Sequence, residues 1–332
     1  GQIGAYSAYS GGSITVDQWH AKRYPVVNDD NNPNTINPAG FDFTELDHNV
    51  DHIVKPVRDA LTAKGEKLFL NLCYVSFNNG GPSVHDDPQE YAEFALATVQ
   101  HLKQKYGLEP DTWEVVLEPD YTTGTGWNGQ KIGQIIVATA QRFEANGIKT
   151  KFVAPSAWSM TNASRLFDEI AGVPGAVSKM AEISYHRYAG VSTNALNNLK
   201  TRAQNNALGL SMLELWFGDA NADVLFEDLS AGAVAFQGRV VQGLFTGTPA
   251  TGLTMQNDVL QNSALYRAVR PGAARVGAQA QAGVFTPLAF LRPDGKVVVA
   301  VKSSAAGTAT LRGLSSGNYR VTTVTSGVQS GP

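Results

Sequence analysis

Two glutamates stand at the ends of strand-like, otherwise apolar segments of this 332-residue chain. Glu118 follows the run TWEVVL, and Glu214 lies within the run LSMLEL. An unpaired charge in such a segment is expensive to bury, so glutamates are uncommon there. Two carboxylates about 5–5.5 Å apart perform retaining glycoside hydrolysis, in which one protonates the leaving oxygen and the other attacks the anomeric carbon. Because the chain has 29 acidic residues, two strand-end salt bridges are the alternative interpretation.

Aromatic and imidazole side chains accompany the two glutamates. A third strand-like segment ends in YHRY, which places His186 and Tyr188 at the same kind of position. Tryptophans occur at or just beyond predicted strand ends, and sugar rings bind flat aromatic faces through their apolar C–H groups. Each tryptophan alone is as often a packing residue, but together they favour a carbohydrate ligand. They are Trp19, Trp127, Trp158 and Trp216.

The elements that must position these residues alternate along the chain. Strands are predicted at 67–75, 112–117, 151–154, 182–185, 210–215 and 252–255, with amphipathic helical segments between them. One such helix starts at Asp87-Pro88, an N-cap followed by a proline at the first helical position, and stops at Gly107. This repeat of strand and helix predicts parallel βαβ units and favours a (β/α)8 barrel, whose active residues lie at the carboxyl ends of strands. The first strands, sought at 6–9 and 14–16, are poorly defined.

The rhythm changes after Pro271. Short strand-like runs at 283–291, 296–302, 308–314 and 318–325 follow one another with turn residues between them and no helix. We therefore predict a barrel over residues 1–271 and a small antiparallel, β-sandwich-like domain over residues 272–332.

The strand-end motifs resemble those of clan A glycoside hydrolases. YGLEPDTWEVVLEPD (106–120) is similar to their fourth-strand acid/base motif, ISYHRY (183–188) to their sixth-strand segment, and MLELW (212–216) to their nucleophile strand. RPGAARVGAQ (270–279) with the strands after it resembles the junction and side domain of families 30 and 39. The resemblance implies a retaining β-glycoside hydrolase that degrades a poly- or oligosaccharide.

The resemblance also implies roles for individual residues. Glu118 would be the acid/base, Glu214 the nucleophile, and His186 and Tyr188 the partners that orient the nucleophile or the sugar; Arg23 would hold the nucleophile ionised. One position departs from the pattern, since Leu117 replaces the asparagine that contacts the sugar 2-hydroxyl in the family. If another residue makes this contact, Asn78 and Trp127 on neighbouring loops are the first candidates.

Composition argues against several classes of binding partner. A net charge of −3 gives no attraction to nucleic acid or an anionic membrane, and no apolar run is long enough to span a membrane. The single cysteine, Cys73, excludes an intrachain disulfide and a cysteine zinc cage. We expect a monomer without cofactor, and the low charge with abundant Gly, Asn, Ser and Thr suggests a secreted bacterial protein.

Two other functions stay open on the residues. One is a carbohydrate-binding barrel whose catalysis has weakened, which Leu117 would mark. The other is a metal-dependent barrel hydrolase in which Glu118, Glu214 and His186 bind the ion.

Overall fold

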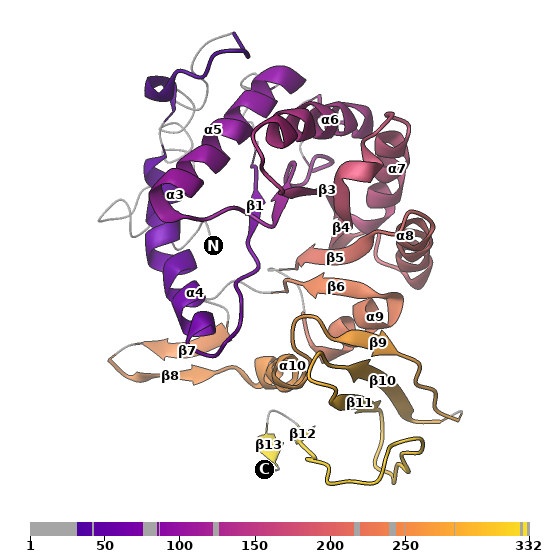
Figure 1. Cartoon of the computed structure of the whole chain (residues 1–332). Helices are drawn as coiled ribbons and strands as arrows, with labels where there is room; N and C mark the ends of the chain where they lie inside the picture. The colour runs from indigo at the N-terminus through magenta and orange to yellow at the C-terminus, as the bar shows by residue number, and fades with distance from the viewer. Residues whose placement is uncertain are drawn as a thin grey trace. The chain divides into compact units, whose positions relative to one another are not determined.

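The chain folds into two compact units, Gly1–Glu214 and Leu215–Pro332 (Figure 1). The computed structural model describes residues 32–41, 43–75, 85, 87–121, 126–215, 220–238, 244–248, 250–281, 283–325 and 328–330. The strands sought at 6–9 and 14–16 lie outside these residues. Four of the predicted site residues lie outside them as well: Trp19, Arg23, Asn78 and Trp216.

A curled parallel sheet forms the centre of the first unit. Neighbouring strands run in the order β1 to β5, and each pairs in parallel with the next along the chain. The strands are β1 (Asn71–Cys73), β2 (Thr112–Glu114), β3 (Lys151–Ser159), β4 (Met180–Ala189) and β5 (Gly209–Glu214). The helices between them are α5 (Pro88–Tyr106), α6 (Gly129–Ala145), α7 (Met160–Ala171) and α8 (Thr193–Asn205), which follow one another around the outside of the sheet (Figure 1). The predicted barrel-type alternation is confirmed.

Local sequence sets the ends of the helices. The side chain of Asp87 accepts hydrogen bonds from the backbone N–H groups of Gln89 and Glu90, which satisfies two free donors at the start of α5. Gly107 ends α5 with φ at 63°, a conformation that costs glycine little. Asn128 caps α6 by accepting from the N–H of Lys131. The helix predicted between Asp87 and Gly107 is therefore confirmed together with its caps.

Short helices precede β1. They are η2 (Pro38–Gly40), α3 (Thr44–Asn49), the π-helical turn η3 (Val50–Val54) and α4 (Lys55–Thr62), while η4 (Val177–Lys179) precedes β4. Asp47 of α3 is held against α5, because its carboxylate contacts His101 at 2.6 Å and Lys105 at 2.7 Å. Among the described helices, none is both long enough and apolar enough to cross a membrane.

The strand β2 is shorter than its predicted segment, 112–117, but its backbone pairing continues. The N–H of Val115 bonds to the carbonyl of Val153, that of Leu117 to Tyr74, and that of Glu118 to Ser156. These bonds carry the chain to Glu118 at the carboxyl end of the sheet. Beneath them lies an aromatic core in which the Tyr91 hydroxyl accepts from the indole N–H of Trp113 at 2.7 Å.

The second unit contains small antiparallel sheets. Its elements are α9 (Ala222–Ala231), β6 (Ala233–Phe236), β7 (Phe245–Thr248), β8 (Gly252–Met255), α10 (Asn257–Ala268), β9 (Ala274–Val276), β10 (Phe285–Leu291), β11 (Val297–Ser303), β12 (Thr323–Thr325) and β13 (Val328–Ser330). Strand β10 pairs antiparallel with β9 and β11, and β12 with β13. A core of Leu225, Phe226, Leu265, Leu288 and Phe290 joins α9 and α10 to this sheet.

Two strand predictions in this unit are wrong. The segment Gly252–Met255 was predicted as a parallel barrel strand, but it pairs antiparallel with Phe245–Thr248 in a hairpin. A four-residue segment, Gly-Leu-Thr-Met, does not specify a partner, and the nearby antiparallel strand is reached at little loop-closure cost. The segment 308–314 forms no strand and is exposed apart from one half-buried residue. The unit also begins upstream of Pro271, because α9, β6, β7, β8 and α10 belong to it.

Candidate active site

Three buried side chains converge at the carboxyl ends of the parallel strands. Glu118, His186 and Glu214 each present a donor or acceptor atom within 4.8 Å of the others. Nδ1 of His186 lies 2.8 Å from Oε1 of Glu118, and the Tyr188 hydroxyl donates to Oε1 of Glu214 at 3.0 Å. In the register of β4 and β5, His186 is paired with Glu214. Four residues predicted from sequence therefore meet in one place, and each glutamate has a different partner.

The backbone at Glu118 is held in an unusual conformation. Its φ is +47°, in the left-handed region that non-glycine residues rarely adopt. Pro119 follows it, and a proline disfavours helical conformations of the residue before it. Such strain costs about 1–3 kcal/mol and persists only where the surroundings enforce it. Here the Glu118 N–H bonds to Ser156, and the Glu118 carbonyl accepts from the N–H of Tyr121 at 3.1 Å.

Burial dominates the electrostatics of Glu214. Its side chain is 7% exposed, and desolvation raises its pKa from 4.5 to about 7. The positive charge of His186 and the Tyr188 hydroxyl lower the pKa, whereas the negative charges of Glu118 and Glu114 raise it. The state of this carboxyl group therefore changes near neutral pH.

A second layer of polar groups lies deeper in the sheet. Glu114 is buried on β2, and its Oε2 accepts from the side-chain amide of Asn71 at 2.8 Å. Between β4 and β5, the hydroxyl of Ser211 donates to the carboxylate of Glu182. Burial raises the pKa of Glu182, and the charge of Glu114 adds to this effect. The site thus rests on one buried and one half-buried acid, to which the sequence analysis assigned no role.

The turn after Glu118 is tied to the end of β3. The carboxylate of Asp120 accepts from the backbone N–H of Trp158 at 2.7 Å and of Ser159 at 3.1 Å. It also accepts from the side-chain amide of Asn162 at 2.9 Å. The ring of Trp158 lies beside that of Tyr121, with 5.6 Å between the centroids. Asp120 and Tyr121 were not predicted, although they directly follow Glu118 and Pro119 in the motif.

Trp127 occupies a different environment from Trp158. Its side chain is 7% exposed. Its ring lies 6.2 Å from those of Tyr74 and Tyr91, within an aromatic cluster. We predicted that Trp127 contacts sugar, but neighbouring rings cover its indole and leave little surface for a ligand. The indole forms part of the core beneath the site.

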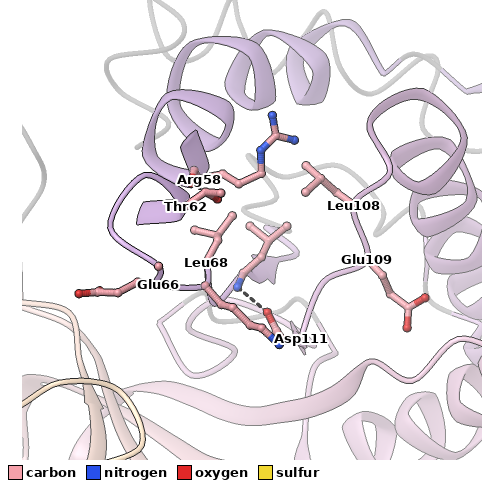
Figure 2. A pocket seen from close by; sticks show the side chains of 10 residues that line it. Arg58, Thr62, Glu66, Leu68, Leu108, Glu109 and Asp111 are labelled. Carbon is pink, nitrogen blue, oxygen red and sulfur yellow. Dashed lines mark hydrogen bonds between the residues drawn. The ribbon is translucent and has the colours of Figure 1, made fainter. Parts of the chain in front are cut away.

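The described residues also line a shallow pocket of about 480 Å³. Its walls come from the segments just before β1 and β2, and the N–H of Leu70 donates to Asp111 across it at 2.8 Å (Figure 2). This is the amino-terminal end of the strands, opposite to the glutamates. Active sites of barrels lie at the carboxyl end, so the pocket is not the candidate active site.

The donor set could also bind a cation. Within the described parts of the chain, Glu118, His186 and Glu214 are the one group of three acidic, histidine or cysteine side chains close enough to share an ion. Two carboxylates and an imidazole suit zinc and other first-row divalent ions. In this arrangement Nδ1 of His186 already faces Glu118. The residues therefore fit either two carboxyl groups, each with its own hydrogen-bond partner, or a metal site. Activity in the presence of a chelator distinguishes these two interpretations.

Comparison with solved structures identifies the fold. The catalytic domain of the glycoside hydrolase family 30 xylanase C from Talaromyces cellulolyticus matches with a TM-score of 0.66 at 17% identity, over 83% of this chain and 71% of that one. SrfJ from Salmonella typhimurium matches at 0.61 and 14% identity, over 79% and 66%. A conserved exported protein from Bacteroides fragilis matches at 0.57 and 13% identity, over 86% and 75%.

No family model matches the sequence, and no curated protein shows significant similarity to it. The structural likeness confirms the predicted resemblance at the level of the fold: the chain has the barrel-type fold of clan A glycoside hydrolases, with small antiparallel sheets in its C-terminal part.

Proposed function

We propose that the protein is a retaining glycoside hydrolase that cleaves β-linked poly- or oligosaccharides, with Glu118 as acid/base and Glu214 as nucleophile. The observation that carries the proposal is that an oxygen of Glu118 and an oxygen of Glu214 lie within 4.8 Å of each other at the carboxyl ends of β2 and β5. Retaining enzymes space their carboxyl groups at about 5–5.5 Å, whereas inverting enzymes leave about 6.5–9.5 Å for a water molecule. The separation therefore supports direct attack by a carboxylate.

In the first step, Glu214 attacks the anomeric carbon while Glu118 donates its proton to the leaving oxygen. This breaks the glycosidic bond and leaves a glycosyl ester on Glu214. In the second step, Glu118 removes a proton from a water molecule, which displaces Glu214 from the sugar. Because the Tyr188 hydroxyl donates a hydrogen bond to Oε1 of Glu214, we assign the attack on the anomeric carbon to Oε2.

The pKa of Glu214 and its hydrogen bond from Tyr188 point to different roles for this residue. The raised pKa of Glu214 would on its own suit a proton donor. The Tyr188 hydroxyl, however, donates to this carboxylate and so favours its ionised form. Glu214 is also the residue at the nucleophile position of the resembling motif. The nucleophile role rests on this position and on the hydrogen bond from Tyr188.

Single alanine variants test the assignment. Glu214→Ala should abolish hydrolysis of every glycoside, because no group remains to form the ester. Glu118→Ala should lose much less activity on dinitrophenyl glycosides, whose leaving group needs no protonation, than on unactivated substrates. The opposite pattern would exchange the roles, and equal losses for both substrates in both variants would refute the two-glutamate mechanism.

The substrate and product need separate measurements. A panel of aryl glycosides and polysaccharides should begin with xylan, since a xylanase is among the matching structures. NMR of the first-formed product should show net retention, and an inverted anomer would end the proposal. Activity that survives a strong chelator would exclude the metal-dependent alternative. Sugar binding without hydrolysis would favour the carbohydrate-binding barrel over the hydrolase. Secretion and a monomeric state remain part of the proposal, and a matching structure is an exported protein.

A further inference from the structure

Two aromatic rings stand together on the turn that carries the proposed acid/base. Tyr121 is 57% exposed. Its ring is tilted by 50° to that of Trp158, with 5.6 Å between the centroids. The pair therefore offers a broad, partly open aromatic surface of the kind that binds sugar rings.

This surface is fixed by the fold before any ligand arrives. Asp120 links the two aromatic residues: it precedes Tyr121 in the chain, and its carboxylate accepts a hydrogen bond from the backbone N–H of Trp158. The N–H of Tyr121 bonds to the carbonyl of Glu118. A rigid platform loses little conformational entropy on binding, so its contacts contribute more fully to affinity.

The position of the platform indicates which part of a glycan it meets. Both rings come from the ends of β2 and β3, and Tyr121 shares one turn with Glu118. The nucleophile stands on β5, with β3 and β4 between it and β2. A proton donor faces the leaving oxygen and the sugar attached to it. Groups on the donor's own turn therefore face the leaving-group side of the bond that breaks.

We propose that Tyr121 and Trp158 form a binding subsite for the sugar on the leaving-group side of the cleaved bond. This rests on the proposed function and extends it: the enzyme takes substrates with at least one sugar beyond the cleavage point, and Tyr121 sets how strongly that sugar contributes to kcat/KM.

A comparison of two substrates tests the subsite. A glycosyl fluoride has a leaving group too small to reach the platform, whereas an oligosaccharide places a sugar ring on it. Tyr121→Ala should lower kcat/KM for β-1,4-xylohexaose, or for the cello- or laminarihexaose if these are cleaved, at least about tenfold more than for the matching fluoride. Tyr121→Phe keeps the ring and should restore most of the loss, which a role of the hydroxyl alone would not allow.

A matched control uses another exposed aromatic of the same unit. Phe69 is 59% exposed and precedes β1, at the opposite end of the strands. Phe69→Ala should change both kcat/KM values equally. Equal losses of Tyr121→Ala on the fluoride and the hexasaccharide would refute the subsite while leaving the hydrolase intact.

Binding measured without turnover separates the two proposals. Calorimetric titration of Glu214→Gln with the same three hexasaccharides should give a Kd that rises about tenfold when Tyr121→Ala is added. An unchanged Kd would refute the subsite. If neither these three nor any glycan of the panel is hydrolysed by the unmodified enzyme or bound by Glu214→Gln, both the proposed function and the subsite are overturned.

Discussion

Replacing Glu214 by glutamine should make the protein more stable above neutral pH. Each pKa unit corresponds to about 1.4 kcal/mol, and the pKa of Glu214 rises from 4.5 to about 7 on folding. The group therefore contributes stability that is fully present below pH 4.5 and is lost as pH rises through 7. Relative to the protonated form, holding the ionised carboxylate in the folded state costs about 3 kcal/mol at pH 8.5.

Glutamine has the shape of glutamic acid and cannot ionise, and its side-chain carbonyl can still accept from Tyr188. Glu214→Gln should therefore raise the free energy of unfolding by up to about 3 kcal/mol at pH 8.5. With about 2 cal/mol/K of unfolding entropy per residue, this corresponds to a Tm increase of about 4 °C for 332 residues. At pH 5 the folded side chain is mostly protonated while the unfolded one is partly ionised, so the difference should shrink to about 0.8 kcal/mol, or about 1 °C in Tm.

Calorimetric or fluorescence melting of both proteins from pH 5 to pH 8.5 measures this difference. Glu144→Gln provides the control, because Glu144 is a glutamate 57% exposed that pairs with Lys179 on the surface. Its effect should stay below about 1 kcal/mol at both pH values. A Tm difference for Glu214→Gln that is the same at both ends of the range, or a variant less stable at pH 8.5, would refute the argument from burial.

Three further outcomes follow from other contacts. Glu114→Gln removes a negative charge that raises the pKa of Glu214, so the acidic limb of the pH profile of kcat/KM should move to lower pH; an unmoved limb would show that the two carboxylates are not coupled. Since Leu117 can neither donate nor accept a hydrogen bond, 2-hydroxy and 2-deoxy aryl glycosides should differ by less than about 1 kcal/mol in kcat/KM after correction for intrinsic reactivity, and a penalty of about 3 kcal/mol would show that another residue contacts the hydroxyl. Tyr91→Phe leaves the buried indole N–H of Trp113 without its acceptor and should destabilise the fold by about 1–3 kcal/mol in denaturant titration; an unchanged midpoint would contradict the need for this bond.

The order of the barrel elements could be predicted where local signals were strong. Helix α5 has an N-cap, a first-position proline, a regular apolar face and a terminal glycine, all within one segment. The strands from β1 to β5 follow from apolar runs at regular spacing, because parallel strands joined by helices need such a repeat. Prediction failed at β8, where a four-residue segment fits several partners and the antiparallel hairpin was the one formed.

Some residues of the candidate site could likewise be predicted from sequence, and others could not. Glu118, His186, Tyr188 and Glu214 could be found from sequence, because each ends a strand and the carboxyl ends of parallel strands meet at one edge. The placement of the tryptophans could not be found, since an indole is equally suited to a core and to a sugar platform. Packing against Tyr74 and Tyr91 buries Trp127, whereas the hydrogen bonds of Asp120 hold the backbone of Trp158 beside Tyr121.

Sequence by itself therefore determined which candidate residues stand at the strand ends and which strands present them, because both depend on residue type and on short-range periodicity. Only the tertiary structure decided how those residues act together. The pKa of Glu214 depends on burial and on Glu114, which lies 100 positions earlier in the chain. The left-handed backbone of Glu118 depends on its hydrogen bond to Ser156 of the next strand. Distances of a few ångströms between remote segments set these properties, and no local pattern in the sequence encodes such distances.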